Sequence, residues 1–424
     1  MPTGRDEMLA WIDRQRSRLL EMVAAWAEIG SWSRDPDGIA AMQAAAAEAC
    51  GRLGPVERIP AGPREEITDS GETQTVPGAD ILSVRREAAA DRPRVLLGIH
   101  LDTVHPPGPG CPPVHLADDG RTLRGPGVAD AKGGLAVMLV ALEAFERWAA
   151  ADRLGWEVFI NADEELGSPS SGPFLAAAAS RNDLGLLYEP ALDPAGTLAG
   201  ARKGSGNFTV VVRGRAAHAG RQFSDGRNAV AAAARLATAC DRLNAAGRDL
   251  TVNVAACHGG EAFNVVPDRA ILRINLRTAA DRDAEWATAR LRAAVAEAAG
   301  EEGIEATLHG SFHCPPKPLD EPTRALLDRI SVAGRALGLA IEQRATGGVC
   351  DGNKLAAAGL PTIDTLGVRG GGIHSPAEYL LVESLVERAK LTAVLLADLA
   401  EEGLPWSPRT ARTAAPGKGA SACT

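Results

Sequence analysis

Acidic and imidazole side chains recur where predicted strands end or in the loops beside them: His100, Asp130, Glu164, Glu165, Glu189 and His374. In an open α/β sheet, ligands bind outside the carboxyl ends of the strands, so we expect these side chains along one edge of one sheet. Two imidazoles and several carboxylates suit a pair of divalent cations such as zinc, with one carboxylate bridging them. The pattern therefore predicts a two-metal site.

Each of these residues also has an ordinary structural interpretation. A single His or Asp in a loop is more often a hydrogen-bonding or capping residue than a metal ligand. The metal interpretation is favoured because several such residues fall on one sheet edge, and because adjacent Glu164 and Glu165 would repel each other without a cation.

An alternation of strands and helices must position these side chains. Strands are predicted at 56–59, 81–85, 95–99, 156–162, 184–188 and 362–366, and helices at 7–29, 37–53, 135–150 and 321–337. This order predicts an α/β fold, with a mixed and mostly parallel sheet between helices. The apolar strand 95–99 runs directly into His100, and strand 184–188 ends at Glu189.

The pattern changes near residue 203. Strands at 207–213, 250–256 and 270–278, with helices at 227–246 and 281–299, predict a mostly antiparallel sheet covered by two helices. The Pro-rich stretch 314–318 is interpreted as the return linker. We therefore predict a catalytic domain in two parts, 1–202 and 316–407, an inserted α+β domain at 203–315, and a disordered tail at 408–424.

Composition narrows the class of protein further. The chain has 424 residues, 45% apolar and 23% charged, which is enough for two domains with hydrophobic cores. A net charge of −9 without a basic stripe argues against nucleic acid and leaves small molecules as the expected partners. Seven scattered cysteines, and the lack of a signal-peptide core or membrane-length apolar run, predict a cytoplasmic protein with no membrane contact.

The ordered motifs resemble those of the two-metal, co-catalytic-zinc amidohydrolases and exopeptidases. That family contains glutamate carboxypeptidase, aminoacylase, acetylornithine deacetylase and succinyl-diaminopimelate desuccinylase. The matching motifs are His100-x-Asp102, Gly125-x-Gly127-x-x-Asp130-x-Lys132-Gly133-Gly134, Glu164-Glu165-x-Gly167-Ser168, Glu189 and His374-Ser375. Residues 203–315 resemble the inserted lid and dimerisation domain of the family, so the resemblance covers nearly the whole chain and implies a homodimer.

The resemblance implies a ligand set for two divalent cations, zinc in the first place, with cobalt or manganese as alternatives. Asp130 would bridge the two cations. His100 and Glu189 would complete one site, and Glu165 and His374 the other.

The resemblance also implies two catalytic roles beside the metals. Asp102 would accept the second ring N–H of His100 and so fix its tautomer. Glu164 would be the general base, which takes a proton from the attacking water and delivers it to the leaving amine. The peptide between Asp130 and Ala131 stands where the family uses a cis bond.

Three further residues lie in the predicted lid. The family position of His218 reaches the active site of the other subunit and stabilises an oxyanion, although a surface His at a Gly-rich turn is the plain alternative. Asn264 and Arg277 match positions that bind the substrate carboxylate, and a guanidinium is well shaped for that task. Arg277 could equally be a solvated strand residue. Arg202 and Lys203 could contribute to the same contact but are interpreted as hinge residues.

Two features bear on the substrate. The family tends to place Glu at the position of Glu189 in its deacylases and carboxypeptidases, and Asp in its aminopeptidases and dipeptidases. Val349 and Cys350 stand where relatives commonly have Gly, Thr or Ser. A Cys350 nucleophile would need a paired base, but His374 is already assigned to a metal.

The sequence therefore predicts a metal-dependent hydrolase of an amide bond next to a carboxylate, with an N-acyl amino acid or a small peptide as substrate. A non-catalytic small-molecule binder on the same fold, and a di-zinc aminopeptidase or dipeptidase, remain as alternatives.

Overall fold

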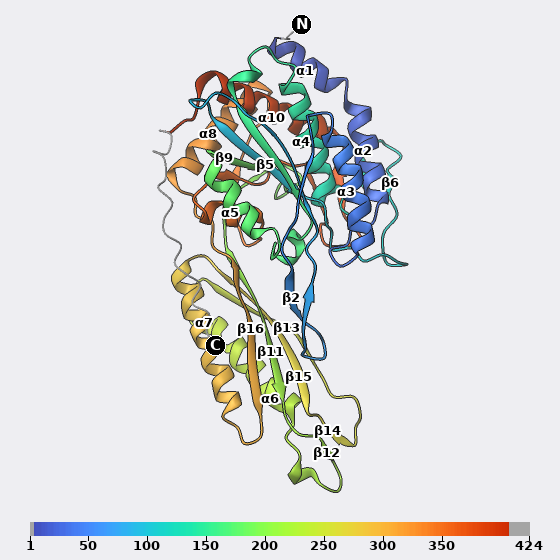
Figure 1. Cartoon of the computed structure of the whole chain (residues 1–424), viewed down its shortest axis with the longest axis vertical. Coiled ribbons are helices and arrows are strands. Elements are labelled where there is room, and N and C mark those ends of the chain that lie inside the picture. The colour runs from blue at the N-terminus through green and yellow to red at the C-terminus, as the bar shows by residue number, and fades with distance from the viewer. Residues whose placement is uncertain (1–3, 407–424) are drawn as a thin grey trace.

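The computed structural model describes residues 4–406, so the predicted tail at 408–424 lies outside the described residues. A broad upper unit, residues 4–203 and 315–406, stands above a narrower lower unit, Gly204–Cys314 (Figure 1). Within residues 4–406, every helix is too short or too polar to cross a membrane.

A six-stranded mixed sheet forms the centre of the upper unit. Its strand order is β1 (Glu57–Ile59), β4 (Ile81–Arg86), β8 (Gly155–Asn161), β5 (Arg94–His100), β9 (Leu184–Leu187) and β18 (Thr362–Ile363). The last four strands in this order are parallel, whereas β4 is antiparallel to both of its neighbours. The predicted α/β class with a mostly parallel sheet is confirmed.

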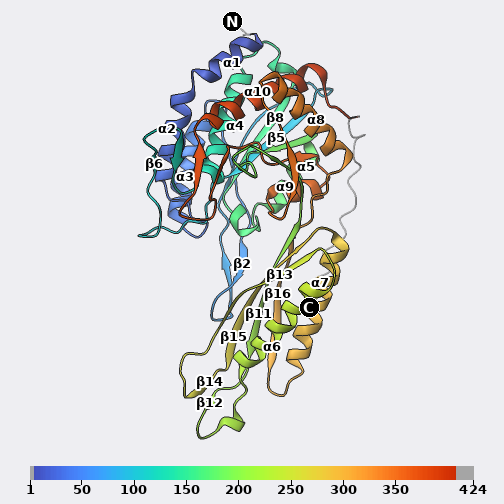
Figure 2. The ribbon, with the colours of Figure 1, turned by 180° about the vertical axis from the view of Figure 1, so that it is seen from behind.

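Helices bury both faces of this sheet (Figures 1 and 2). Val95, Leu97 and Ile99 of β5 share one core with α1 (Arg5–Asp13), α2 (Arg16–Glu28), α3 (Pro36–Cys50), α4 (Gly134–Phe145), α8 (Glu321–Ala336) and α10 (Glu383–Glu402). Leu96 instead packs with α5 (Gly172–Arg181) and α9 (Asp351–Ala357) on the opposite face. Because both faces are covered, β5 is a continuous apolar run, as buried parallel strands are.

The lower unit has an antiparallel sheet in the order β13 (Leu250–Gly259), β15 (Arg269–Thr278), β11 (Gly204–Arg213) and β16 (Glu305–Cys314). Helices α6 (Ala229–Asp241) and α7 (Asp281–Ala299) pack on one face of this sheet through alternate residues such as Val210, Leu272 and Ile274. Strands β12 (Ala217–His218) and β14 (Val265–Val266) pair at the far tip (Figure 1).

Shorter strands complete the described fold. Strands β6 (His115–Leu116), β7 (Thr122–Arg124), β19 (Gly370–Gly371) and β20 (Tyr379–Leu381) form a small antiparallel sheet, and β10 (Leu198–Arg202) pairs in parallel with β17 (Gln343–Thr346).

A β-hairpin of the upper unit, β2 (Arg64–Ile67) and β3 (Thr73–Val76), extends down beside the lower sheet (Figure 1). Arg273 of β15 donates to the carbonyl of Ile67 at 3.1 Å and to Asp69 at 2.8 Å. At the hairpin turn, Gly71 has a left-handed φ of 75°, and a Cβ there would lie 2.8 Å from a methyl of Val211. Val211 and Arg273 alternate with the residues that face α6 and α7, so the hairpin covers the other face.

The structure differs from the predicted elements in several places. Helices α5, α9 and α10 and most of the short strands were not predicted, and the strand predicted at 362–366 is reduced to β18. The helix predicted at 7–29 is two helices, α1 and α2, which meet at Arg14 and Gln15. Neither the hairpin β2–β3 nor strand β16 was predicted, because both alternate charged or polar residues with few apolar ones. The predicted helix 281–299 coincides with α7.

Candidate metal centre and active site

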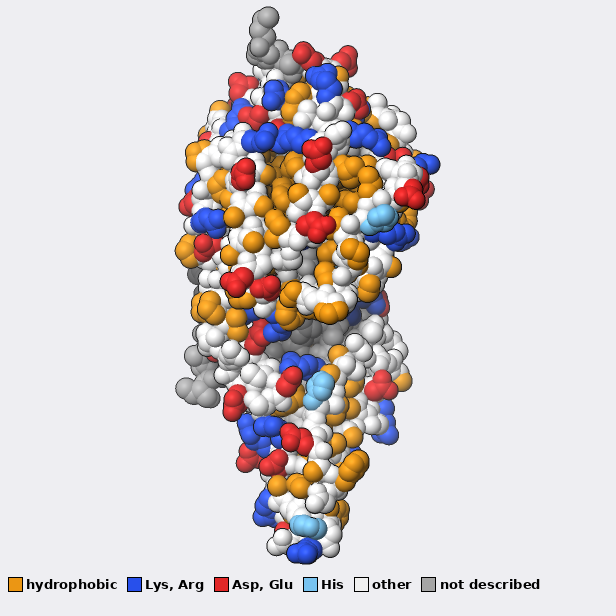
Figure 3. Space-filling model, turned by 90° about the vertical axis from the view of Figure 1, so that its right-hand side faces the viewer, with side chains coloured by type: hydrophobic (Ala, Val, Ile, Leu, Met, Phe, Trp, Pro, Cys, Tyr) orange, Lys and Arg blue, Asp and Glu red, His pale blue; other side chains and the backbone are white. Residues whose placement is uncertain are grey.

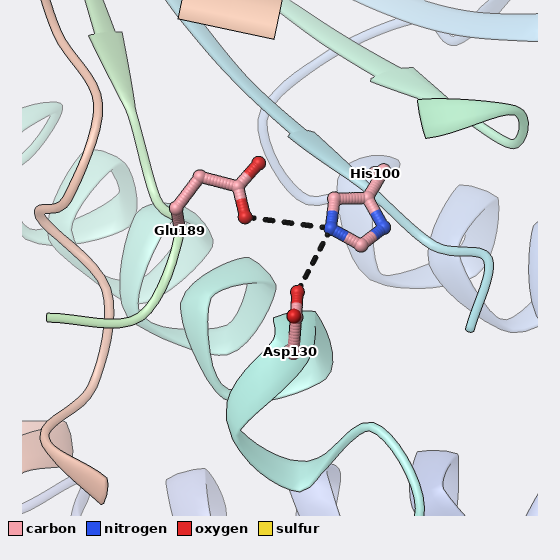
Figure 4. Close-up of side chains that lie close together, drawn as sticks. All are labelled: His100, Asp130 and Glu189. Carbon is pink, nitrogen blue, oxygen red and sulfur yellow. Dashed lines mark hydrogen bonds and ion pairs between the residues drawn. The ribbon is translucent and has the colours of Figure 1, made fainter. Parts of the chain in front are cut away.

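The first group of ligand-type side chains is His100, Asp130 and Glu189 (Figure 4). His100 is the last residue of β5, and its Nε2 lies 3.1 Å from Oδ1 of Asp130 and 3.5 Å from Oε2 of Glu189. All three side chains are buried. Burial opposes the charge on His100, but Glu189, Asp102 and Asp130 raise its pKa well above the usual value.

The second group is Asp130, Glu165 and His374. Nε2 of His374 lies 3.3 Å from Oδ2 of Asp130 and 3.3 Å from Oε2 of Glu165. Asp130 thus turns one carboxylate oxygen to each imidazole. The two groups share Asp130, which is the arrangement expected of a bridging carboxylate.

The local backbone conformation positions these side chains. His374 adopts a left-handed backbone with φ of 60°, a conformation that bulky residues rarely adopt and that concentrates at functional sites. The helix α4 starts so close to the end of β9 that a Cβ on Gly134 would lie 1.9 Å from the carbonyl oxygen of Tyr188. This close approach brings the Asp130 turn next to Glu189. The Asp130–Ala131 peptide is cis, as the resemblance implies.

The two groups fit divalent cations. Zinc binds nitrogen and oxygen ligands at about 2.1 Å, so two ligands of one tetrahedral ion lie roughly 3.4 Å apart, close to the spacings above. Buried Oε1 of Glu165 has no hydrogen-bond partner among the described residues. Burial and the charge of Asp130 raise the pKa of Glu165 to about 7. The negative charge of the neighbouring carboxylates is therefore not balanced by nearby positive charge.

Asp102 supports this centre in a way that differs in detail from the prediction. Nδ1 of His100 lies 3.0 Å from the backbone carbonyl of Asp102 and 3.4 Å from its carboxylate, so the carbonyl is the nearer acceptor. The Asp102 carboxylate instead accepts the backbone N–H groups of Glu164 and Glu165, each at 3.2 Å. Asp102 therefore ties the Glu164–Glu165 turn to the end of β5.

Glu164 lines a cavity of about 500 Å³ together with four of the five candidate ligands, Asp130, Glu165, Glu189 and His374. Burial and the charge of Glu189 raise the pKa of Glu164 well above the usual value, which favours a carboxyl that can hold a proton. Both units contribute walls, and the surface narrows between them (Figure 3). Arg277 and His313 come from the lower unit, and Arg202 from the upper unit.

The structure does not bring all predicted site residues together within one chain. Arg277 lines the cavity, and its guanidinium donates to Asn275 at 2.9 Å and to the carbonyl of Gly347 at 3.1 Å. His218 and Asn264 lie instead at the far tip of the lower unit, where both are exposed. Neither lines the cavity.

Sequence reasoning missed two groups in the cavity wall. Arg202, interpreted as a hinge residue, donates to Asp364 at 2.8 Å, and Lys317 donates to the same carboxylate at 2.6 Å. These opposing cations hold the pKa of buried Asp364 at about 2 against the effect of burial. His313 was hidden beside the return linker, and no motif marked it.

Val349 and Cys350 both line the cavity. The Cys350 thiol is buried at the start of α9 and accepts the N–H of Gly352 at 3.3 Å. Burial raises the pKa of this thiol well above the usual value, which disfavours the thiolate needed for attack. The structure thus lends no support to a Cys350 nucleophile.

His313 leads to a prediction on acid stability. Burial, Lys354 and Arg277 lower its pKa to about 4, below the unfolded value of roughly 6.5. The folded state therefore binds this proton less readily than the unfolded state, and its stability falls as the pH drops from about 6.5 towards 4. At about pH 5 the loss is about 2 kcal/mol relative to neutral pH. Urea unfolding should show a smaller acid loss in His313→Gln than in wild type, and equal losses would contradict the assignment.

The mixed α/β sheet, with two groups of ligand-type side chains at one edge, is the arrangement expected of a metal-dependent hydrolase. The chain belongs to peptidase family M20/M25/M40, whose model matches residues 96–398. The family expected from the motifs is thereby confirmed.

Similar proteins include enzymes of different substrates. Carboxypeptidase G2 of Pseudomonas sp. (strain RS-16) is 29% identical over 308 residues, which cover 72% of this chain and 74% of that protein. A succinyl-diaminopimelate desuccinylase of Hahella chejuensis is 26% identical over 352 residues, 79% of this chain and 88% of that protein. The solved structure of the dipeptidase Dug1p of Saccharomyces cerevisiae matches with a TM-score of 0.74 at 14% identity, covering 95% of this chain and 99% of that chain.

Proposed function

We propose that this protein is a two-metal amidohydrolase that cleaves the amide bond of an N-acyl amino acid or short peptide next to a free carboxylate. One observation carries the proposal. Glu164 lines the same cavity as Asp130, Glu189, Glu165 and His374, which come from both ligand groups, and Arg277 stands in the same cavity wall. The cavity thus offers a base, two cation sites and an anion-binding group to one substrate.

Zinc, or else cobalt or manganese, would be held by the two groups described above. The cations would supply the positive charge that polarises the amide carbonyl and acidifies the attacking water. Glu164 accepts the proton of that water at its carboxylate and then donates it to the leaving nitrogen. Glu164 must therefore carry the proton between these two steps.

Arg277 binds the substrate carboxylate in this proposal. Its guanidinium is oriented by Asn275 and by the carbonyl of Gly347. The remaining N–H groups of the guanidinium can donate two parallel hydrogen bonds to a carboxylate. The carboxylate anchor fixes which amide bond reaches Glu164. His218 and Asn264 of a second chain complete the site in a homodimer formed through the lower unit.

Hydrolysis of a substrate panel tests the proposed activity. N-acyl amino acids and dipeptides should release free amine, whereas the same compounds with an amidated carboxyl terminus should react much more slowly. Faster cleavage of the amidated peptides with a free amino terminus would instead identify an aminopeptidase. Cleavage of dipeptides without cleavage of N-acyl amino acids would identify a dipeptidase. Binding without turnover of any compound would support the non-catalytic binder.

Metal removal should abolish this activity. We expect more than one equivalent of divalent cation per chain after gentle dialysis, because the two groups provide more ligands than one ion needs. Chelation should also lower Tm, since cations that bind only the folded state stabilise it. Inductively coupled plasma analysis and a thermal melt check both results. A preparation that is fully active without bound metal would refute the proposal.

A further inference from the structure

One buried carboxylate outside the ligand groups contacts the turn that carries Asp130. Glu378 is 1% exposed, and its Oε1 accepts the backbone N–H groups of Ala129 at 2.9 Å and Asp130 at 3.0 Å. Its Oε2 accepts the N–H of Gly127 at 3.0 Å and lies 2.9 Å from Nε2 of His105. Four donors thus converge on one side chain.

The backbone of Glu378 joins the same two loops. Its N–H donates to the carbonyl of Ser375, next to His374, at 3.2 Å, and its carbonyl accepts the N–H of Gly125 at 3.4 Å. Strand β20, which begins at the next residue, pairs with β7 just before the Asp130 turn. Glu378 therefore stands where the loop of His374 meets the loop of Asp130.

We propose that Glu378 is a positioning residue that holds Asp130 against His374 and so sets the affinity of the cation site formed by Asp130, Glu165 and His374. This inference rests on the proposed function. Backbone N–H groups that donate to a carboxylate form strong charge-assisted hydrogen bonds, so three of them orient the turn firmly. The other site shares Asp130, but its remaining ligands, His100 and Glu189, have no hydrogen bond with Glu378. Glu378 therefore holds the loops of two ligands of the first site and of only one ligand of the other.

Charge is needed at this position as well as shape. A glutamine oxygen could accept the two N–H groups that Oε1 accepts now, but its amide NH₂ would then face the N–H of Gly127. Two buried N–H donors that face each other without an acceptor are unfavourable, because a lost buried hydrogen bond is costly. The turn is therefore expected to move away from the amide. Glu378→Gln should therefore displace the Asp130 turn while changing side-chain volume little.

A buried carboxylate elsewhere provides a matched control. Glu157 is 5% exposed and binds Arg181 and Asn182, and it contacts no residue of either ligand group. Glu157→Gln should lower Tm without changing cation binding. A merely structural role of Glu378 would give the same result in both variants.

The test is calorimetric titration of Zn²⁺ into the chelator-stripped full-length protein. In Glu378→Gln we expect one of the two binding steps to lose about 10–100-fold in affinity, as when partners of metal ligands are removed elsewhere. The other step should change less, because Asp130 is its only ligand on the turn that Glu378 holds. Co²⁺ loading should give a changed visible spectrum in Glu378→Gln and an unchanged one in Glu157→Gln.

A shorter variant guards against misfolding. Glu378→Asp keeps the charge but cannot reach all four donors, so it should weaken the same step by a smaller factor. Unchanged affinities in both Glu378 variants, or equal losses at both steps, would overturn the positioning role. Wild-type protein that binds fewer than two cations would overturn the proposed function together with this inference.

Discussion

Glu164→Gln should lower kcat by about 10²–10⁴-fold while the cations stay bound. The amide keeps the shape of the carboxylate but cannot accept the proton of the attacking water. The side chain is not a member of either ligand group, so metal content should not change. Steady-state kinetics on the best substrate of the panel, with metal analysis of the same sample, provides the measurement.

The neighbouring residue is the matched control for this experiment. Glu165→Gln makes the same chemical change one position later, but Glu165 belongs to the second ligand group. We expect that variant to lose both activity and part of its metal. Near-normal turnover of Glu164→Gln with metal retained would remove Glu164 from the role of base.

His218→Ala should lower kcat by about 10²–10³-fold with little change in metal content, if the imidazole stabilises an oxyanion. Within one chain His218 is exposed at the tip of the lower unit and does not line the cavity. Its action therefore requires a second subunit. His258→Ala is a suitable control, because His258 is also exposed in the lower unit, on β13.

Mixing two inactive variants separates donation in trans from a structural role. A heterodimer of His218→Ala with Glu164→Gln would contain one site with an intact base and an imidazole from the neighbour. Recovered activity on mixing requires donation between subunits. No recovery, with subunit exchange verified by mass spectrometry, would show that His218 does not act in trans.

The candidate residues could be predicted because several follow strand ends, and the family resemblance then implied which five of them are ligands. The apolar run of β5 stops at His100, and β9 is followed by Tyr188 and Glu189, so the sequence alone indicates which edge of the sheet is polar. Parallel neighbours then bring these ends together. The structure places all five predicted ligands within two groups that share Asp130, although their role as metal ligands stays a prediction.

Glu378 and His313 could not be predicted in the same way. Glu378 lies in a polar stretch after His374 that resembles a solvated loop, and it is buried against the Asp130 turn and His105, which are distant in the sequence. His313 belongs to β16, whose alternating polar residues conceal a strand. Burial created by distant segments leaves no local mark on a sequence.

The contact between the two units could be predicted from the sequence only in part. The change from parallel to antiparallel pairing near residue 203 is visible in the strand and helix pattern, but the hairpin β2–β3 is not. Its two strands, Arg64–Ile67 and Thr73–Val76, are short and mostly polar. Their partners, Val211 and Arg273, lie well over a hundred residues away in the chain.

That hairpin restricts how the cavity can open. The chain crosses between the units at two adjacent points, since Ser205 pairs with Cys314, and two adjacent points leave an axis of rotation free. Arg277 also donates to the carbonyl of Gly347 across the boundary, and the contact of Gly71 with Val211 and of Arg273 with Asp69 adds a further attachment away from that axis. Three points that do not lie on one line fix an orientation. The distance between Arg277 and Glu164 across the cavity therefore depends on residues 64–76, none of which lines it.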